Sequence, residues 1–320
     1  MRNIVILIAA ATMWLSAPAA NAQQWPTRPV KVVVPFGPGT TTDAVARALT
    51  AELTQSLGQP FVIVNKGGAD GAIGATELIR SAPDGYTFMV GSNSSIVVVP
   101  LMRKQPPYST LADFSPISIL GESSFFIAVN SKLQVQSLAD LVARAKANPG
   151  KLNYGTGNTT GIVSSLLLAQ SAGISMQHVP YKSEPEAIPD LLSGQLDVVL
   201  STFLNVGQHA QSGNLRLLAT TLSERSSLAP DVPTLLEAGQ PKLPVAPWVA
   251  LVGPANLPSD ITQRLNAAVV AAFVKQDIRD QLAKLGFAPR TSSAAEFGVF
   301  LKDQVEIWGN AIKEGGLEAQ

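Results

Sequence analysis

The sequence predicts an α/β protein of two lobes, each with a mainly parallel sheet flanked by helices and with a ligand cleft between them. Short runs rich in β-branched residues alternate with amphipathic segments along most of the chain, which is typical of parallel sheets covered by helices. The chain has 320 residues, a length that favours two domains over one.

Residues 1–22 are expected to be a cleavable signal peptide. Arg2 is followed by an apolar run at 4–14 that is too short to span a bilayer, and Ala20-Asn21-Ala22 fits the small-x-small cleavage pattern. A retained membrane anchor is the alternative. The chain has no cysteine, which excludes disulfides and a lipid-bearing cysteine. We therefore expect an exported, monomeric protein of the periplasm.

Composition disfavours several classes of function. Lys plus Arg and Asp plus Glu both total 23, and no basic stripe indicates nucleic acid. His178 and His209 are the two histidines, and neither is spaced for a metal site. No cofactor or metal is expected.

The first half of the chain opens with a strand, a turn and a helix. The strand at 30–34 stops at Pro35, and a turn leads to a helix from Asp43 to Leu57 with Gly58 as its C-cap. Further strands are expected at 61–64, 86–90, 117–120 and 125–129, with a helix ending at Arg80. The glycine-rich stretch 67–74 lacks the dinucleotide-binding pattern and is expected to be a tight turn.

The second half repeats this alternation. Helices are expected at 138–147, 162–173 and 187–193, strands at 152–154, 177–179, 197–200, 215–219 and 248–252, and three helices after that. In the last helix, Phe297, Leu301, Val305, Trp308 and Ile312 form an apolar stripe that is expected to pack on the core. Lobe 1 is expected to comprise residues 23–121 and 243–320, and lobe 2 residues 122–242. The chain would then cross between the lobes twice, near 120–124 and 241–247, forming a hinge.

The turn before the first helix is the best candidate for a binding site. The first N–H groups of a helix lack internal partners and attract anions without a lysine or arginine, and here they lie beside three threonines. Asp43 stands in a capping-box position relative to Thr40, so a structural role is favoured for its carboxylate. The candidate residues of this turn are Phe36, Gly37, Gly39, Thr40, Thr41, Thr42 and Asp43.

A second strand-to-helix turn, at 155–160, is also rich in glycine and hydroxyls. Taken alone, such a turn could equally be an ordinary connector. Together the two turns could hold both ends of a small dianion in the crevice beyond the strands. The candidates here and at two further strand ends are Thr156, Gly157, Asn158, Thr159, Ser92, Asn93, Ser94, Ser201 and Thr202. No G-x-S-x-G elbow is present, so an enzyme is not expected; a hydrolase or lyase that uses His178 is the rival.

Several stretches in order resemble the Bug family, the periplasmic receptors of tripartite tricarboxylate transport systems. They are WPTRPV (25–30), PFGPGTTTD (35–43), APDGYT (82–87), NPGKLNYG (148–155), HVPYK (178–182), PDVPT (230–234) and EAG (237–239). The resemblance implies a periplasmic-binding-protein type fold that closes on a small carboxylate. It also implies delivery of that solute to a membrane permease; a sensor that signals to a membrane kinase is an alternative.

Three departures from the family pattern bear on the ligand. Thr40 stands where further glycine is usual, and the second loop is shorter and lacks a histidine near Ile162-Val163. Ser201 stands where an aspartate is often found. Without that acid an ammonium group would lack a counter-charge, so a plain mono- or dicarboxylate, aromatic acids included, is expected rather than an amino acid.

Overall fold

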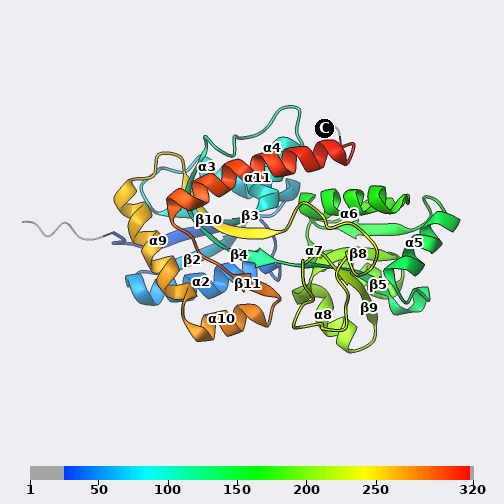
Figure 1. The fold of residues 1–320 in the computed structure, drawn as a ribbon. Helices are drawn as coiled ribbons and strands as arrows, with labels where there is room; N and C mark the ends of the chain where they lie inside the picture. The colour runs from blue at the N-terminus through cyan, green and yellow to red at the C-terminus, as the bar shows by residue number, and fades with distance from the viewer. Residues whose placement is uncertain (1–24, 318–320) are drawn as a thin grey trace, which may run out of the picture.

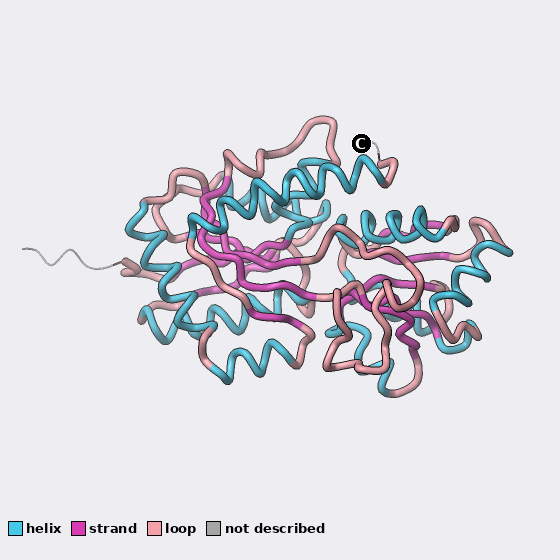
Figure 2. Tube along the Cα trace, in the orientation of Figure 1, coloured by secondary structure: helices cyan, strands magenta, loops and turns pink. Residues whose placement is uncertain are grey.

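The computed structural model describes residues 25–317, so the expected signal peptide lies outside the described residues. Within this range no helix has both the length and the apolar character that a bilayer crossing needs. Two sheets lie side by side, each with helices on both of its faces (Figures 1 and 2).

The first lobe contains a six-stranded sheet in the order β11-β4-β10-β3-β1-β2. Its strands are β1 (Val30–Val34), β2 (Phe61–Asn65), β3 (Thr87–Ser92), β4 (Phe114–Ser123), β10 (Trp248–Pro254) and β11 (Phe287–Pro289). Its helices are α2 (Thr41–Leu57), α3 (Ala72–Ile79), α4 (Val99–Leu101), α9 (Ser259–Phe273), α10 (Gln276–Ala283) and α11 (Ala294–Glu314). Short helical turns η1 (Ala69–Gly71) and η2 (Ser94–Val98) join them.

The second lobe contains a five-stranded sheet in the order β7-β6-β8-β5-β9. Its strands are β5 (Phe125–Asn130), β6 (Asn153–Thr156), β7 (Gln177–Pro180), β8 (Val198–Thr202) and β9 (Leu215–Thr220). Its helices are α5 (Leu138–Ala147), α6 (Thr159–Ala172), α7 (Glu184–Ser193) and α8 (Phe203–Gln211), with a short turn η3 (Ser131–Leu133).

In each sheet four strands run in one direction. In the first sheet β1 pairs in parallel with β2 and β3, whereas β10 is antiparallel to both β3 and β4, and β11 is antiparallel to β4. In the second, β6 pairs in parallel with β7 and β8, and β5 is antiparallel to β8 and β9. The expected two-lobed α/β fold is confirmed, and the reversed strands include β5 and β10, which follow the crossings between the sheets.

Strand β1 is apolar except at Lys31 because both faces of its sheet are covered. Val33 packs in the cluster that contains α3 and α11, whereas Val32 and Val34 pack with α2 and α9. On α11 the expected stripe is buried at Phe297, Leu301, Trp308 and Ile312, with Val305 packed at its margin. Helix α11 crosses the first sheet and reaches α6 of the second lobe (Figure 1).

The two crossings between the sheets lie against each other. Strand β4 passes into β5 through Ser124 alone, and the chain returns through 221–247 to β10. The backbone N–H of Ser123 donates to the carbonyl of Pro247 over 3.0 Å. The expected lobe boundaries, after residues 121 and 242, remain a prediction.

Candidate functional site

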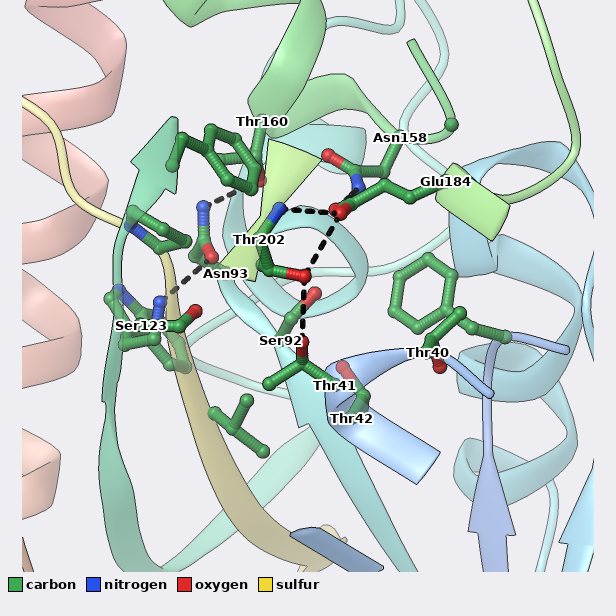
Figure 3. Close-up of a pocket in the computed structure, with 16 residues that line it drawn as sticks. Thr40, Thr41, Thr42, Ser92, Asn93, Ser123, Asn158, Thr160, Glu184 and Thr202 are labelled. Carbon is green, nitrogen blue, oxygen red and sulfur yellow. Dashed lines mark hydrogen bonds between the residues drawn. The ribbon is translucent and has the colours of Figure 1, made fainter. Parts of the chain in front are cut away.

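A cavity lies between the lobes where the carboxyl ends of β1, β3, β6 and β8 face one another (Figure 3). Its empty volume, counting the open mouth, is about 440 Å³. The residues that line it are Phe36, Thr40, Thr41, Thr42, Ser92, Asn93, Ser123, Phe125, Gly157, Asn158, Thr160, Glu184, Thr202, Pro247, Trp248 and Val249.

Nine of the residues expected from the sequence line this cavity: Phe36, Thr40, Thr41, Thr42, Ser92, Asn93, Gly157, Asn158 and Thr202. They come from both lobes and from all four of the strand ends that the sequence singled out. The fold therefore brings the two expected turns to a shared cavity.

The N-terminus of α2 presents donors to this cavity. Thr40 is the N-cap, and its hydroxyl accepts a hydrogen bond from the N–H of Asp43 over 3.3 Å. Helix geometry leaves the N–H groups of Thr41 and Thr42 without an intrahelical acceptor, and no oxygen of the described residues accepts from them. The N–H groups and hydroxyls of Thr41 and Thr42 and the positive end of the α2 dipole therefore lie at the same wall of the cavity.

Asp43 does not line the cavity, although it belongs to the expected site. Its carboxylate accepts two hydrogen bonds from Arg47, at 2.9 and 3.0 Å, one from Asn65 at 2.9 Å and one from the N–H of Gly39 at 3.1 Å. Burial opposes ionisation, but these bonds outweigh it and lower the pKa of Asp43 below the ordinary aspartate value. Asp43 therefore shapes the turn, but the expected capping box is only half formed: Thr40 Oγ1 accepts from the N–H of Asp43, whereas the carboxylate of Asp43 accepts from the N–H of Gly39 and not of Thr40.

Six other expected residues also lie outside the lining: Gly37, Gly39, Ser94, Thr156, Thr159 and Ser201. The N–H of Gly39 donates to Asp43, and the carbonyl of Gly37 accepts from Thr40 Oγ1 at 3.1 Å. These glycines act through the shape of the turn; Gly39 has φ +82°, in the left-handed region.

The four hydroxyl residues in this group are bonded to other parts of the protein. Ser94 and Thr159 share a hydrogen bond of 2.7 Å between the lobes. Thr156 Oγ1 lies 2.6 Å from His178 Nε2. Ser201 Oγ donates to Glu184 over 2.8 Å. Their hydroxyls therefore hold together the segments that form the cavity walls and do not line the cavity themselves.

Seven lining residues were not expected from the sequence. Five of them lie in the two crossings or directly beside them, which the sequence predicted as a hinge but not as a wall: Ser123, Phe125, Pro247, Trp248 and Val249. Thr160 directly follows the expected turn. Glu184 begins α7, where an acidic residue is common for its effect on the helix dipole, so its position carried no distinct signal.

Glu184 is the only ionisable residue among those lining the cavity in the described part of the chain. Its Oε1 accepts from Asn158 Nδ2 at 2.8 Å, and its Oε2 accepts from Thr202 N at 3.1 Å and Asn205 Nδ2 at 3.0 Å, besides Ser201 Oγ. The expectation that the site lacks an acid because Ser201 replaces an aspartate is wrong. A carboxylate from Glu184 is bonded to Ser201 itself.

The lobes touch across the cleft through polar side chains. Thr41 Oγ1 donates to Thr202 Oγ1 over 3.0 Å, and Asn93 Nδ2 donates to Thr160 Oγ1 over 2.7 Å. Asn93 Oδ1 also accepts from the N–H of Trp248 at 3.1 Å, which ties this contact to the second crossing. The described conformation is therefore a closed one.

His178, the residue on which an enzyme would depend, does not line the cavity. Its ring stacks on Tyr154 with centroids 5.0 Å apart. Burial lowers the pKa of His178 below its ordinary value, and the negative charge of Asp70 only partly offsets this. No group of three or more His, Cys, Asp or Glu residues within 25–317 is arranged to hold a metal ion.

Two α/β lobes that close over a small cavity define a solute-binding protein of the periplasmic-binding-protein class. Comparison with known proteins agrees with this class. The model of the tripartite tricarboxylate transporter family receptor matches residues 45–317, and the chain belongs to this family. Protein BugT of Bordetella pertussis is 36% identical over 98% of this chain and 97% of its own length, which confirms the resemblance to the Bug family.

Solved structures of relatives superimpose closely on this fold. Rpa4515 of R. palustris with adipate has a TM-score of 0.88 and is 30% identical, covering 92% of this chain and 99% of its own. MatC of Rhodopseudomonas palustris with bound malate has a TM-score of 0.85 and is 30% identical, and the match covers 90% of this chain and 100% of the MatC chain. Both resemble this protein along nearly its whole described length.

Proposed function

We propose that this protein is a periplasmic receptor that captures a small carboxylate and delivers it to the membrane permease of a tripartite tricarboxylate-type transporter. The observation that carries the proposal is the N-terminus of α2, whose free N–H groups at Thr41 and Thr42 belong to residues that line the cavity. The carboxylates named for Rpa4515 and MatC support the same ligand class. The protein binds and releases its solute as a monomer, without chemical change.

Capture at this site needs no cationic side chain. No Lys, Arg or His of the described residues lines the cavity, so charge stabilisation comes from backbone N–H groups, hydroxyls and the α2 dipole. In this proposal the solute first meets lobe 1 (residues 23–121 and 243–320). Lobe 2 (residues 122–242) then closes over it by a hinge motion at the two crossings.

A panel of carboxylates tests the proposal directly. A ligand present at ~100 times its dissociation constant adds about 2.7 kcal/mol to the free energy of unfolding, which raises the melting temperature measurably. Thermal shift with succinate, malate, adipate, butanoate, hexanoate and benzoate should find at least one stabilising acid. The preference for a plain carboxylate over an amino acid rested on a missing acid that Glu184 supplies, so glutamate and aspartate belong in the same panel. Stabilisation by none of these acids would contradict carboxylate capture.

Two glycines at opposite ends of α2 form a matched pair of variants. Gly39 precedes the helix with φ +82°, Gly58 follows it with φ +72°, and a Cβ atom on either would meet nothing within 4 Å. Valine at either position therefore costs mainly backbone strain of about 1–3 kcal/mol. Gly39→Val should abolish carboxylate binding by distorting the turn, whereas Gly58→Val should leave it intact. An unchanged dissociation constant for Gly39→Val would remove this turn from the site.

A further inference from the structure

We propose that Glu184 restricts this receptor to solutes with one carboxylate and makes it reject dicarboxylates. The inference rests on the proposed function and narrows its ligand class. Glu184 is the single ionisable residue among the lining residues of the described chain, and it lies opposite α2 in the cavity (Figure 3). The site therefore carries one fixed negative charge before any solute enters.

The carboxylate of Glu184 occupies one group of donors in the second lobe. It accepts hydrogen bonds from the hydroxyl of Ser201, from the N–H and hydroxyl of Thr202, and from the amides of Asn158 and Asn205. Thr202 is the N-cap of α8, and Asn158 is the N-cap of α6. These are the hydroxyl, amide and helix-start groups that would otherwise receive a carboxylate of the solute.

The backbone of Gly157 packs tightly against the backbone of Ser183 and Glu184 and so fixes the position of Glu184. A Cβ atom on Gly157 would lie 2.1 Å from the backbone N of Glu184 and 2.2 Å from the carbonyl carbon of Ser183. The start of α7 is therefore packed directly on the turn after β6. Such packing opposes withdrawal of Glu184 from the cavity.

The α2 end of the cavity suits one carboxylate. The N–H groups of Thr41 and Thr42 lie there, and the hydrogen bond from Thr41 Oγ1 to Thr202 Oγ1 shows that the two walls are in contact. A second anionic group on the solute would point toward Glu184, with no cationic side chain of the described residues lining the cavity to offset the repulsion. A neutral or cationic far end meets no such repulsion.

Acids of matched length provide the test, because they differ only at the far end. Calorimetry at neutral pH compares hexanoate, ε-aminohexanoate and adipate; butanoate, γ-aminobutanoate and succinate; hydroxybutanoate and malate; and 4-methylbenzoate and terephthalate. We expect an acid with one carboxylate to bind at least tenfold more tightly than its dicarboxylate partner. Glu184→Gln, which keeps the length and removes the charge, should reduce this preference at least tenfold.

Glu186→Gln is the matched control for the loss of one negative charge on the same helix. Glu186 is exposed, accepts from Ser183 Oγ at 3.0 Å and does not line the cavity, so its variant should keep the wild-type preference. Glu184→Ala is a second variant, since it frees the second-lobe donors and should favour dicarboxylates further. If neither variant folds, the preference of the wild-type protein for acids with one carboxylate still tests the proposal.

The outcomes separate the two proposals. Adipate, succinate, malate or terephthalate binding as tightly as its partner, or a preference unchanged in Glu184→Gln, would overturn the role of Glu184 while leaving carboxylate capture intact. Binding of none of these acids to the wild-type protein or to Glu184→Ala would overturn carboxylate capture, and the role of Glu184 with it.

Discussion

The hydroxyl of Thr41 donates a hydrogen bond to the hydroxyl of Thr202 over 3.0 Å, although the two residues are 161 positions apart in the chain. Thr41 is the first residue of α2, and Thr202 is the last residue of β8. Each hydrogen bond of this kind contributes about 0.5–1.5 kcal/mol net. A few of them are therefore enough to set the balance between open and closed lobes.

Ser94→Ala tests this view of closure without changing a cavity wall. Ser94 bonds to Thr159 between the lobes at 2.7 Å, and neither residue lines the cavity. Loss of about 0.5–1.5 kcal/mol from the closed state should weaken solute binding by roughly two- to tenfold. Calorimetry with the best acid of the panel measures this change.

The neighbouring Ser95→Ala is the control for Ser94→Ala. Ser95 is equally buried, but its hydroxyl donates to the carbonyl of Ser92 at 3.2 Å, within the same lobe. We expect this variant to keep the wild-type affinity. Equal losses in both variants would show that the bond between the lobes has no special part in closure.

Gly157→Ala should damage the site through the backbone of α7. The added Cβ would lie 2.1 Å from the N atom of Glu184, so the start of α7 must shift at a cost of about 1–3 kcal/mol. We expect a lower melting temperature and solute binding weakened at least tenfold.

Gly309→Ala is the matched control for that change. Gly309 lies within α11, and a Cβ there meets nothing within 4 Å; alanine should stabilise this helix by about 0.5–1 kcal/mol. Wild-type affinity in Gly157→Ala would contradict the tight packing of the second turn on Glu184.

Asp43→Asn should make the fold less sensitive to acid. Hydrogen bonds from Arg47, Asn65 and Gly39 outweigh burial and lower the pKa of Asp43, so its ionised form stabilises the fold above the unfolded-state value of about 3.9. That stability is lost as the pH falls through the lower folded-state pKa. At neutral pH we expect the variant to lose about 1–3 kcal/mol.

Chemical denaturation across pH measures this difference between wild type and Asp43→Asn. The gap in the free energy of unfolding should be widest near neutral pH and should narrow below about pH 4. A gap that stays constant with pH would mean that the charge of Asp43 does not stabilise the turn.

His178→Gln should change acid stability and leave solute binding unchanged. Burial lowers the pKa of His178, and the charge of Asp70 only partly offsets this, so the folded protein favours the neutral ring. The unfolded chain takes up a proton near pH 6.5, and wild-type stability therefore falls as the pH drops below about 6.5 toward the folded-state pKa. The variant lacks this loss, and thermal melts at several pH values should show a flatter profile.

The same variant tests the rival hydrolase or lyase. Because His178 does not line the cavity, binding measured by calorimetry should persist in His178→Gln, and mass spectrometry should find the bound acid unaltered in both proteins. Turnover of the acid by the wild-type protein that disappears in the variant would favour an enzyme.

Local patterns in the sequence determined the elements that carry the site. The strand at β1, its stop at Pro35 and the C-cap at Gly58 follow from β-branched residues, the missing donor of proline and the left-handed conformation of glycine. The hydroxyl-rich turns before α2 and α6 were predicted for the same local reasons. Helix α8 and strand β11 were not predicted: Gly207 lowers the helix propensity of α8, and the three residues of β11 are too few to show a pattern.

Which of these hydroxyls line the cavity was decided only by the tertiary structure. Thr159 and Thr160 are adjacent and chemically alike, yet only Thr160 lines the cavity, whereas Thr159 bonds to Ser94. Glu184 was missed for a related reason: its partner Ser201 lies 17 positions away in the chain, on β8. Local sequence determines backbone conformation, whereas the direction of a side chain and the atoms that it meets depend on how distant segments pack.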